Sequence, residues 1–458
     1  MTNNYNSSRS DLLKRIGLSP SKKLMVFLVS AVLVTIPFGY AYNSVCIILF
    51  VLYSFLSARQ KDFSFSTSLL LPMLLFTLMV LSLTWSIDFQ SSIRALSKEA
   101  ALFFIPLAFF FNKQLIRMGV RKILKNLSVG MCFFGVYFLG RAVFRYLQTD
   151  DTDVFLSAEL STCVITPVYL SALFSMALFY FLSVKNKKFL DYAGFVFVAC
   201  IIGLLLNKVI IITDVILAVA YILFYSKLSK SLKIVSGIAF ITLTALFAYY
   251  ARTKGAFPAE YISNTPEIQA LAVEGLPLHN VTLKEAWSKP VFSENDYFNG
   301  TAFRTYQVRI FTEMLEEDKV FFTGYGISAS IDKIEEKAKE HNVFEGGVLN
   351  HRYSRQNFHN QYVEAFADLG IVGFILLLLI LVLNFKNAIL SKDFMHIAFA
   401  ILMIALLLTE SFLWRQRGVV FFTVFYCLFN GIPLQADKEK YEKNTNNRGG
   451  RFSGIASL

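Results

Sequence analysis

Charged residues are scarce in this sequence. Of its 458 residues, 17% are charged and 55% are hydrophobic, whereas soluble domains carry about 25% charged residues. The hydrophobic residues fall in runs that are spread along the chain and separated by short basic loops. This composition excludes a soluble protein held by a single anchor. It predicts an all-α, polytopic membrane protein.

Cysteine is also scarce, and its placement excludes two kinds of site. All five cysteines lie in or at the ends of apolar runs: Cys46, Cys132, Cys163, Cys200 and Cys427. None falls in the long polar segment, and none has metal-ligand spacing. We therefore expect small membrane hydrophobes, with no disulfide framework and no metal site among the cysteines.

A cleavable signal peptide and a basic patch are both missing. Residues 1–23 are polar and basic, and the first apolar run leads directly into others, unlike a signal peptide. The net charge of +12 would suit a nucleic-acid partner, but the basic residues punctuate the apolar runs and form no single patch. We expect membrane lipids, and no nucleic acid, among the partners.

Twelve apolar runs approach the ~20 residues that a helix needs to cross a bilayer. The shortest is the second, and a tight turn at Asn207-Lys208 separates the seventh from the eighth. We predict spans at 24–42, 43–58, 67–86, 97–112, 123–146, 162–184, 189–206, 208–226, 232–250, 359–384, 393–411 and 415–432.

Lysine and arginine set the expected orientation of these spans. Outside the long polar segment they favour the side that carries both termini, which the positive-inside rule makes cytoplasmic. The tail after Lys443 is rich in Asn, Arg, Gly and Ser and is predicted to be disordered. The predicted order is a cytoplasmic tail at 1–23, spans 1–9 at 24–250, a large periplasmic loop at 251–358, spans 10–12 at 359–432 and a cytoplasmic tail at 433–458.

The predicted loop at 251–358 is the one soluble-like segment, and it is slightly acidic. Amphipathic patterns predict helices at Phe303–Glu317 and Ile331–His341, the second with Ser330 as N-cap. Between them, Thr323-Gly324-Tyr325-Gly326 is expected to form a turn.

Several cations stand at predicted outer helix N-termini, where the helix dipole disfavours a cation by about 0.3–1 kcal/mol. They are Arg94, Lys98, Lys208, Arg415 and Arg417. One explanation is that long basic side chains extend to the lipid headgroups. The other is that helix ends and cations converge on one anion, and phosphate suits arginine forks best. The second explanation predicts an outward-facing diphosphate site.

Two arginines of the first loop helix differ in their surroundings. Arg304 and Arg309 are five residues apart, about 140° around a helix, so they do not share a face. Arg309 has Glu313 four residues on, which predicts a surface ion pair. Arg304 has no acid nearby in the sequence and is the better candidate for an anion ligand.

His359 lies where the polar loop becomes a span. A titratable side chain at this depth is costly, so it is a candidate functional residue. A lone histidine at an interface is more often a structural, hydrogen-bonded residue. The proposed anion site beside it and the apolar helix beneath it favour a general base. Three other histidines show no metal-ligand spacing with it: His279, His341 and His351.

Acidic and amide side chains follow close to His359. Glu410 lies across a short turn from Arg415 and Arg417, which predicts an ion pair that orients the arginines. The span after His359 carries a stripe at helical spacing that could pair with neighbouring cations: Asn360, Glu364 and Asp368.

These stretches together resemble the O-antigen ligase and O-antigen polymerase superfamily. An arginine on a loop helix followed by a Gly-x-Gly turn, a His-Asn motif and a closing motif carry the resemblance, and a weaker likeness lies at residues 83–88. The stretches are Arg304 through Gly324-Tyr325-Gly326, His359-Asn360 through Asp368-Leu369-Gly370-Ile371-Val372-Gly373, and Thr409-Glu410-Ser411 with Arg415-Gln416-Arg417-Gly418 and Phe421-Phe422.

There is one departure from the family pattern. The family usually has arginine where the eighth span begins, and this chain has Asn207-Lys208 there. Lysine keeps the positive charge but loses the bidentate grip on phosphate.

The resemblance implies a glycosyltransferase of the bacterial inner membrane that needs no metal and no cofactor. Its donor would be a glycan on undecaprenyl diphosphate, and an acceptor hydroxyl would displace the lipid diphosphate. His359 would be the base, and Lys208, Arg304, Arg415 and Arg417 would neutralise the leaving group. A lipid A core acceptor, which makes the enzyme a ligase, is favoured over a second lipid-linked glycan, which makes it a polymerase, and over a protein side chain.

Two other functions are kept as alternatives. Asp151-Thr152-Asp153 with Glu159 resembles an Asp-x-Asp metal motif of an oligosaccharyltransferase, and glycan transfer that survives EDTA would exclude it. Intramembrane charge also suits a transporter or flippase for a lipid-linked glycan. Against a transporter stand the lack of an inverted repeat and of paired Gly/Pro-broken spans. Movement across liposomes without covalent transfer would favour it.

Overall fold

The structure is a computed structural model that describes residues 21–58, 66–117, 119–161, 165–253, 279–293, 295–343 and 353–431. Within these ranges the chain is helical apart from one parallel pair of short strands, β1 (His279–Asn280) and β2 (Asp296–Tyr297). The predicted all-α class is confirmed for this part of the chain. Several predictions concern residues outside these ranges, namely most of both tails, part of the loop at 251–358, Cys163 and His351.

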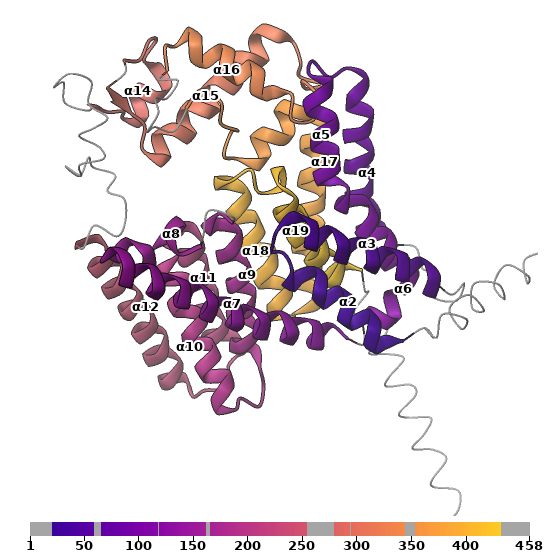
Figure 1. Ribbon diagram of the computed structural model, residues 1–458, viewed down its shortest axis with the longest axis vertical. Helices are drawn as coiled ribbons and strands as arrows, with labels where there is room; N and C mark the ends of the chain where they lie inside the picture. Colours follow the sequence, from indigo (N-terminus) through magenta and orange to yellow (C-terminus); the bar gives the residue numbers. More distant parts are fainter. Residues whose placement is uncertain are drawn as a thin grey trace, which may run out of the picture.

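The helices before the loop follow one another through short links (Figure 1). They are α2 (Lys22–Val34), α3 (Tyr40–Ser57), α4 (Thr67–Leu81), α5 (Phe89–Glu99), α6 (Ala101–Arg117), α7 (Val120–Thr149), α8 (Ser157–Ser161), α9 (Pro167–Ser183), α10 (Phe189–Leu204), α11 (Lys208–Ala220) and α12 (Lys230–Thr253). The loop holds α14 (Leu283–Ser288), α15 (Gly300–Asp318) and α16 (Ser330–Glu340), and α17 (Gln361–Ser391), α18 (Phe394–Thr409) and α19 (Gln416–Asn430) follow it.

Five helical segments of the described chain are long and apolar enough to cross a membrane: Tyr40–Ser57, Thr67–Thr84, Val120–Thr149, Lys208–Tyr225 and Gln361–Ser391. Three shorter apolar helices, α9, α10 and α18, accompany them. The chain is therefore a multi-pass membrane protein. Each of the twelve predicted spans overlaps at least one helix, whereas the count of twelve crossings stays a prediction.

The predicted span at 97–112 begins too early in the chain. The chain forms a separate amphipathic helix, α5, which Asp88 caps, before α6 begins at Ala101. Lys98 therefore lies in the last turn of α5, where the helix dipole favours a cation. The dipole conflict that the sequence suggested at Lys98 does not exist.

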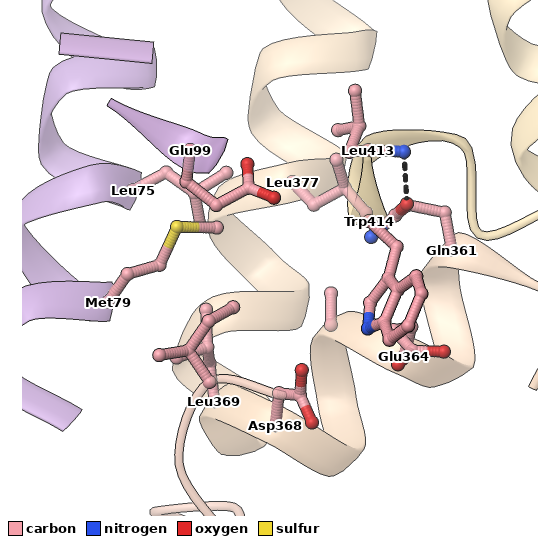
Figure 2. Close-up of a pocket in the computed structure, with 12 residues that line it drawn as sticks. Leu75, Met79, Glu99, Gln361, Glu364, Asp368, Leu369, Leu377, Leu413 and Trp414 are labelled. Atoms are coloured by element: carbon pink, nitrogen blue, oxygen red, sulfur yellow. Dashed lines mark hydrogen bonds between the residues drawn. The ribbon is translucent and has the colours of Figure 1, made fainter. Parts of the chain in front are cut away.

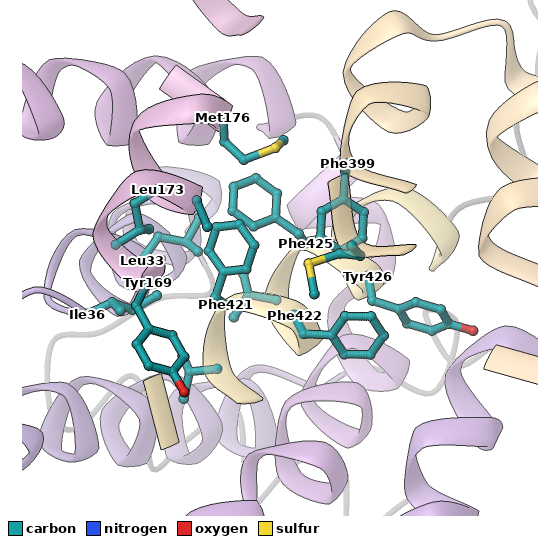
Figure 3. Close-up of a cluster of buried hydrophobic side chains, with 14 of the residues drawn as sticks. Leu33, Ile36, Tyr169, Leu173, Met176, Phe399, Phe421, Phe422, Phe425 and Tyr426 are labelled. Atoms are coloured by element: carbon teal, nitrogen blue, oxygen red, sulfur yellow. The ribbon is translucent and has the colours of Figure 1, made fainter. Parts of the chain in front are cut away.

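The helix α19 lies in the middle of the bundle and is buried on all sides. Figure 3 shows its aromatic side chains packed between α2, α9 and α18, with Phe421 and Phe425 beside Leu173 and Phe399. A helix that is hydrophobic all round belongs in the interior of a protein. Its two ends are thereby fixed relative to the surrounding helices, and one of them carries Arg415.

The loop helices α14, α15 and α16 lie above the bundle in Figure 1 and have a hydrophobic core of their own, which includes Tyr306 and Ile310. The two predicted amphipathic helices are confirmed. The predicted N-cap is wrong, because Ala329 occupies that position and Ser330 is the first residue of α16. The Ser330 hydroxyl instead donates to the Asp368 carboxylate at 2.6 Å.

One long helix is broken, which the sequence patterns did not predict. Gly370, at φ +66° and ψ −169°, interrupts α17. The predicted turn Thr323–Gly326 lies against the break: Tyr325 N–H donates to Ala367 C=O and Gly326 N–H to Asp368 C=O, both at 2.9 Å. Phe321 C=O in turn accepts from Ile371 N–H at 2.9 Å. The loop thereby satisfies backbone groups that a broken membrane helix cannot leave unpaired.

Replacing Gly370 with alanine is expected to destabilise the fold. This φ/ψ region is essentially restricted to glycine and costs another residue about 1–3 kcal/mol, and an added Cβ would lie 2.2 Å from Phe322 O. The apparent Tm of purified Gly370→Ala in detergent should fall. Gly140→Ala in α7, where an added Cβ meets nothing within 4 Å, is the control and should melt no lower than the wild type. Equal Tm values for Gly370→Ala and the wild type would show that the break is not a constraint.

Candidate functional site

The site begins with Arg304 in the second turn of α15. Asn299 caps this helix, since its side-chain oxygen accepts from the N–H groups of Thr301 and Ala302. The Arg304 guanidinium donates to Thr409 C=O through Nε at 2.9 Å and to Gly300 C=O through Nη1 at 2.9 Å. The loop helix is thus tied to the end of α18.

Glu410 lies between the two main candidates. Its Oε1 accepts from Arg304 Nη2 at 3.1 Å, and its Oε2 lies 3.3 Å from His359 Nδ1. The predicted pairing of Glu410 with Arg415 and Arg417 is therefore wrong. Glu410 ends α18 in an extended conformation, which directs its side chain to the loop and not along the turn.

His359 is held in an uncommon backbone conformation, with φ +48°. Its N–H donates to Asn357 Oδ1 at 3.3 Å, and its Nε2 lies 3.0 Å from Gln356 Oε1. The ring packs edge-on against Phe303 with 5.9 Å between centroids. Each ring nitrogen thus faces an oxygen, and a neutral imidazole can donate to one of the two.

The start of α17 supports His359 and Glu410 from below. Asn360 caps the helix by accepting from Tyr362 N–H and Val363 N–H. The buried Glu364 accepts through Oε2 from Phe358 N–H at 3.1 Å and from Ser411 Oγ at 2.9 Å. One carboxylate oxygen thus links the residue before His359 to the residue after Glu410.

Asp368 likewise holds a segment of the loop through hydrogen bonds. Its Oδ2 accepts from Ser328 N–H at 2.7 Å and its Oδ1 from the Ser330 hydroxyl. Glu364 and Asp368 were predicted to pair with cations on neighbouring helices. That prediction is wrong, because both accept from uncharged groups and position backbone segments.

Lys208 and Arg415 are exposed helix-end cations. Lys208 is the first residue of α11, and Asn207 caps that helix by accepting from Ile210 N–H at 3.1 Å. The other end of α11 contacts the start of α18, with 4.7 Å between the Tyr221 and Phe394 ring centroids. The two helices are antiparallel, so Lys208 lies toward the end of α18 that carries Glu410.

Arg417 occupies a different environment. It is buried, with 4% exposure. Its Nε and Nη2 donate to Ile36 C=O at 3.2 Å and Phe38 C=O at 3.0 Å, and Tyr40 lies against its guanidinium with 4.4 Å from Cζ to the ring centroid. Arg417 thus holds the link between α2 and α3, beneath the exposed Arg415.

Arg309, the second arginine of α15, is part of a buried network. Arg309 pairs with Glu313 at 2.8 Å as predicted, but it is 9% exposed and not a surface residue. It also donates to Lys289 C=O at 2.7 Å. Nearby, burial lowers the pKa of His341, while the Glu313 carboxylate opposes that shift. This network lies away from Arg304 and stabilises the loop core.

Sequence patterns assigned no role to Gln356, Ser328 and Ser411, which hold His359, Asp368 and Glu364. They have no periodicity, and only the folded chain brings them to these partners. At the Asp-x-Asp stretch, Asp151 caps a short 3-10 helix at Thr152–Phe155, and Glu159 pairs with Arg145 at 2.7 Å. In the part of the chain that the structure describes, no three His, Cys, Asp or Glu side chains gather as a metal site would require.

Asp368→Asn is expected to loosen the loop from α17. An asparagine would turn one acceptor into a donor facing Ser328 N–H or Ser330 Oγ, at a cost of about 1–3 kcal/mol. The apparent Tm should fall, and proteases should cut the loop faster. Glu336→Gln, at an exposed ion pair with Lys333, is the control and should change stability by less than about 0.5 kcal/mol. If the two variants behave alike, Asp368 does not hold the loop.

Comparison with known proteins adds one finding. Residues 193–378 match the family model described as O-antigen ligase. The match includes Lys208, Arg304 and His359, whereas Glu410 and the cations of α19 lie beyond it. A search of the curated proteins found no match. In its apolar helices and in this domain, the chain is similar to the O-antigen ligase and O-antigen polymerase superfamily.

Proposed function

We propose that this protein transfers a glycan from a lipid diphosphate to an acceptor hydroxyl at the outer face of the bacterial inner membrane. The observation that carries the proposal is the Glu410 carboxylate between His359 and Arg304. It joins a candidate base to a candidate anion ligand, at the contact between the loop and the helix ends. The family match supports a membrane glycosyltransferase of this type.

In the proposed reaction, His359 Nε2 takes the proton of the acceptor hydroxyl, and Gln356 turns aside to admit it. Glu410 holds Nδ1 and stabilises the imidazolium that forms, as a carboxylate does for a catalytic histidine. The acceptor oxygen bonds to the anomeric carbon while the bond from that carbon to the phosphate oxygen breaks. The lipid diphosphate leaves with the electron pair of that bond.

Arg304 is the central ligand proposed for the diphosphate. Arginine has five N–H donors, of which three bond Thr409, Gly300 and Glu410. Its side chain is 36% exposed, so the remaining donors can face a ligand. The exposed Lys208 and Arg415 would add charge from the ends of α11 and α19. The buried Arg417 would act through its charge, because carbonyl groups occupy its Nε and Nη2.

The acceptor separates two forms of the proposal. We favour the ligase, in which the glycan passes from undecaprenyl diphosphate to lipid A core, in keeping with the description of the matching family. The alternative is a polymerase that extends a second lipid-linked glycan. Incubating the purified protein with a lipid-linked glycan and each acceptor, then recording which acceptor gains mass, decides between them.

His359→Ala should abolish transfer while the protein still reaches the membrane. Loss of a general base lowers turnover by about 10²–10⁴-fold. Transfer by the purified variant is measured with a lipid-linked glycan donor. His279→Ala, which removes a half-exposed histidine of the same loop, serves as the control and should keep wild-type activity. Wild-type transfer by His359→Ala would refute the assignment.

Reversing the charge at Lys208 should weaken donor binding, because the side chain would then repel the diphosphate. The KM for the donor should rise at least tenfold for Lys208→Glu and stay near the wild-type value for Lys208→Arg, which keeps the charge and adds bidentate geometry. Lys185→Glu, at an exposed lysine before α10, controls for net charge. Unchanged donor KM in Lys208→Glu would remove Lys208 from the diphosphate site.

A further inference from the structure

A second polar site lies behind the candidate catalytic residues. It is a small cavity of about 20 Å³, room for about one water molecule, between α4, α5, α17 and the short helix Phe412–Trp414. Leu75, Met79 and Leu377 form part of its apolar wall. Figure 2 shows Glu99, Glu364 and Asp368 around this space, with the Trp414 ring close to Glu364.

Three polar atoms of the cavity wall have no hydrogen-bond partner among the described residues. They are Glu99 Oε2, Glu364 Oε1 and Trp414 Nε1. Glu99 is 3% exposed and Glu364 is 2% exposed. Burying an acceptor or a donor without a partner costs about 1–3 kcal/mol for each group. Asp368 differs, because Ser328 and Ser330 occupy both of its oxygens.

Few charged groups face this space. On α17 they are Glu364 and Asp368, on α5 they are Glu99 and its neighbour Lys98, and the α4 residues of the wall are apolar. Lys98 Nζ lies over the Trp414 ring, 5.0 Å from its centre. Within the described chain no three carboxylates gather closely enough for a metal ion.

We propose that this cavity binds water, which bridges Glu99 on α5 to Glu364 on α17. A water molecule donates two hydrogen bonds and accepts up to two. It therefore complements two carboxylate oxygens and the Trp414 N–H, which is the set of partners that buried water requires. An apolar ligand would leave all three atoms unsatisfied.

The bridge makes Glu99 a positioning residue for the candidate site. Water holds the free oxygen of Glu364, and the other oxygen of Glu364 binds Phe358 N–H and Ser411 Oγ. Those two residues adjoin His359 and Glu410. The effect on turnover rests on the proposed function, whereas the water site does not.

The direct test is an experimental structure of the full chain at a resolution that shows ordered water. Density should lie within hydrogen-bond distance of Glu99 Oε2 and Glu364 Oε1. A cavity without such density overturns the proposal, whatever the activity of the protein. If His359→Ala kept its activity while the density was present, the proposed function would fail and the water site would stand.

Kinetic measurements on variants of Glu99 test its proposed positioning role. Glu99→Gln can still bind water and should keep kcat within about threefold. Glu99→Leu cannot, and kcat should fall on the order of tenfold or more, while the KM for the donor stays unchanged because the cations are untouched. Glu336→Gln is the control for removing a carboxylate. Equal kcat for Glu99→Leu and the wild type would overturn the role.

A second variant covers the case in which Glu99→Leu fails to accumulate in the membrane. Trp414→Phe removes the indole N–H and keeps an aromatic ring in place. The water density should weaken or shift, and kcat should fall severalfold. Unchanged density and unchanged kcat in Trp414→Phe would contradict the proposed hydrogen bond to Trp414 and, with it, the water bridge as described.

Discussion

The hydrogen bonds between the Thr323–Gly326 turn and the break in α17 position the rest of the site. Gly370 interrupts the helix and frees the carbonyls of Ala367 and Asp368, and the loop supplies the N–H groups that pair with them. A second set of bonds comes from the link between α4 and α5, where Trp85 Nε1 donates to Thr323 C=O at 3.0 Å. Because unpaired backbone groups are costly in a membrane, the loop cannot leave this position cheaply. Arg304 and His359 are placed from the two ends of that docked loop.

Glu410 then links Arg304 and His359, which the docked loop brings close together. A carboxylate shared by an imidazole and a guanidinium couples the orientation of both. A diphosphate that draws Arg304 forward would also change the hydrogen bond that holds His359. In the proposed reaction, substrate binding and the orientation of the base would thus be linked through one side chain. Asn299 caps α15, which carries Arg304, and Asn360 caps α17, which begins just after His359, so the starts of both helices are fixed.

The sequence was enough to identify the candidate residues, but it was not enough to predict which of them pair. Apolar periodicity predicted the helices, and loop position singled out Arg304 and His359. Charge patterns then paired Glu410 with Arg415 and Arg417, since a short turn separates them in the chain. The structure pairs Glu410 with Arg304, which is 106 residues away. Likewise, Lys98 conflicted with a helix dipole only while α5 and α6 were taken as one span. Such contacts depend on where helices end and on how distant segments dock, which local patterns do not contain.

The central place of α19 bears on how the protein is assembled. This helix is the last one described in the chain order, yet α2, α9 and α18 all pack around it. During synthesis, the earlier helices enter the membrane before the helix that fills the space between them exists. Their facing surfaces must remain covered by lipid or by an insertion factor until α19 arrives. The bundle therefore closes only after α19 has been made, and a ribosome stalled before residue 416 would leave it open.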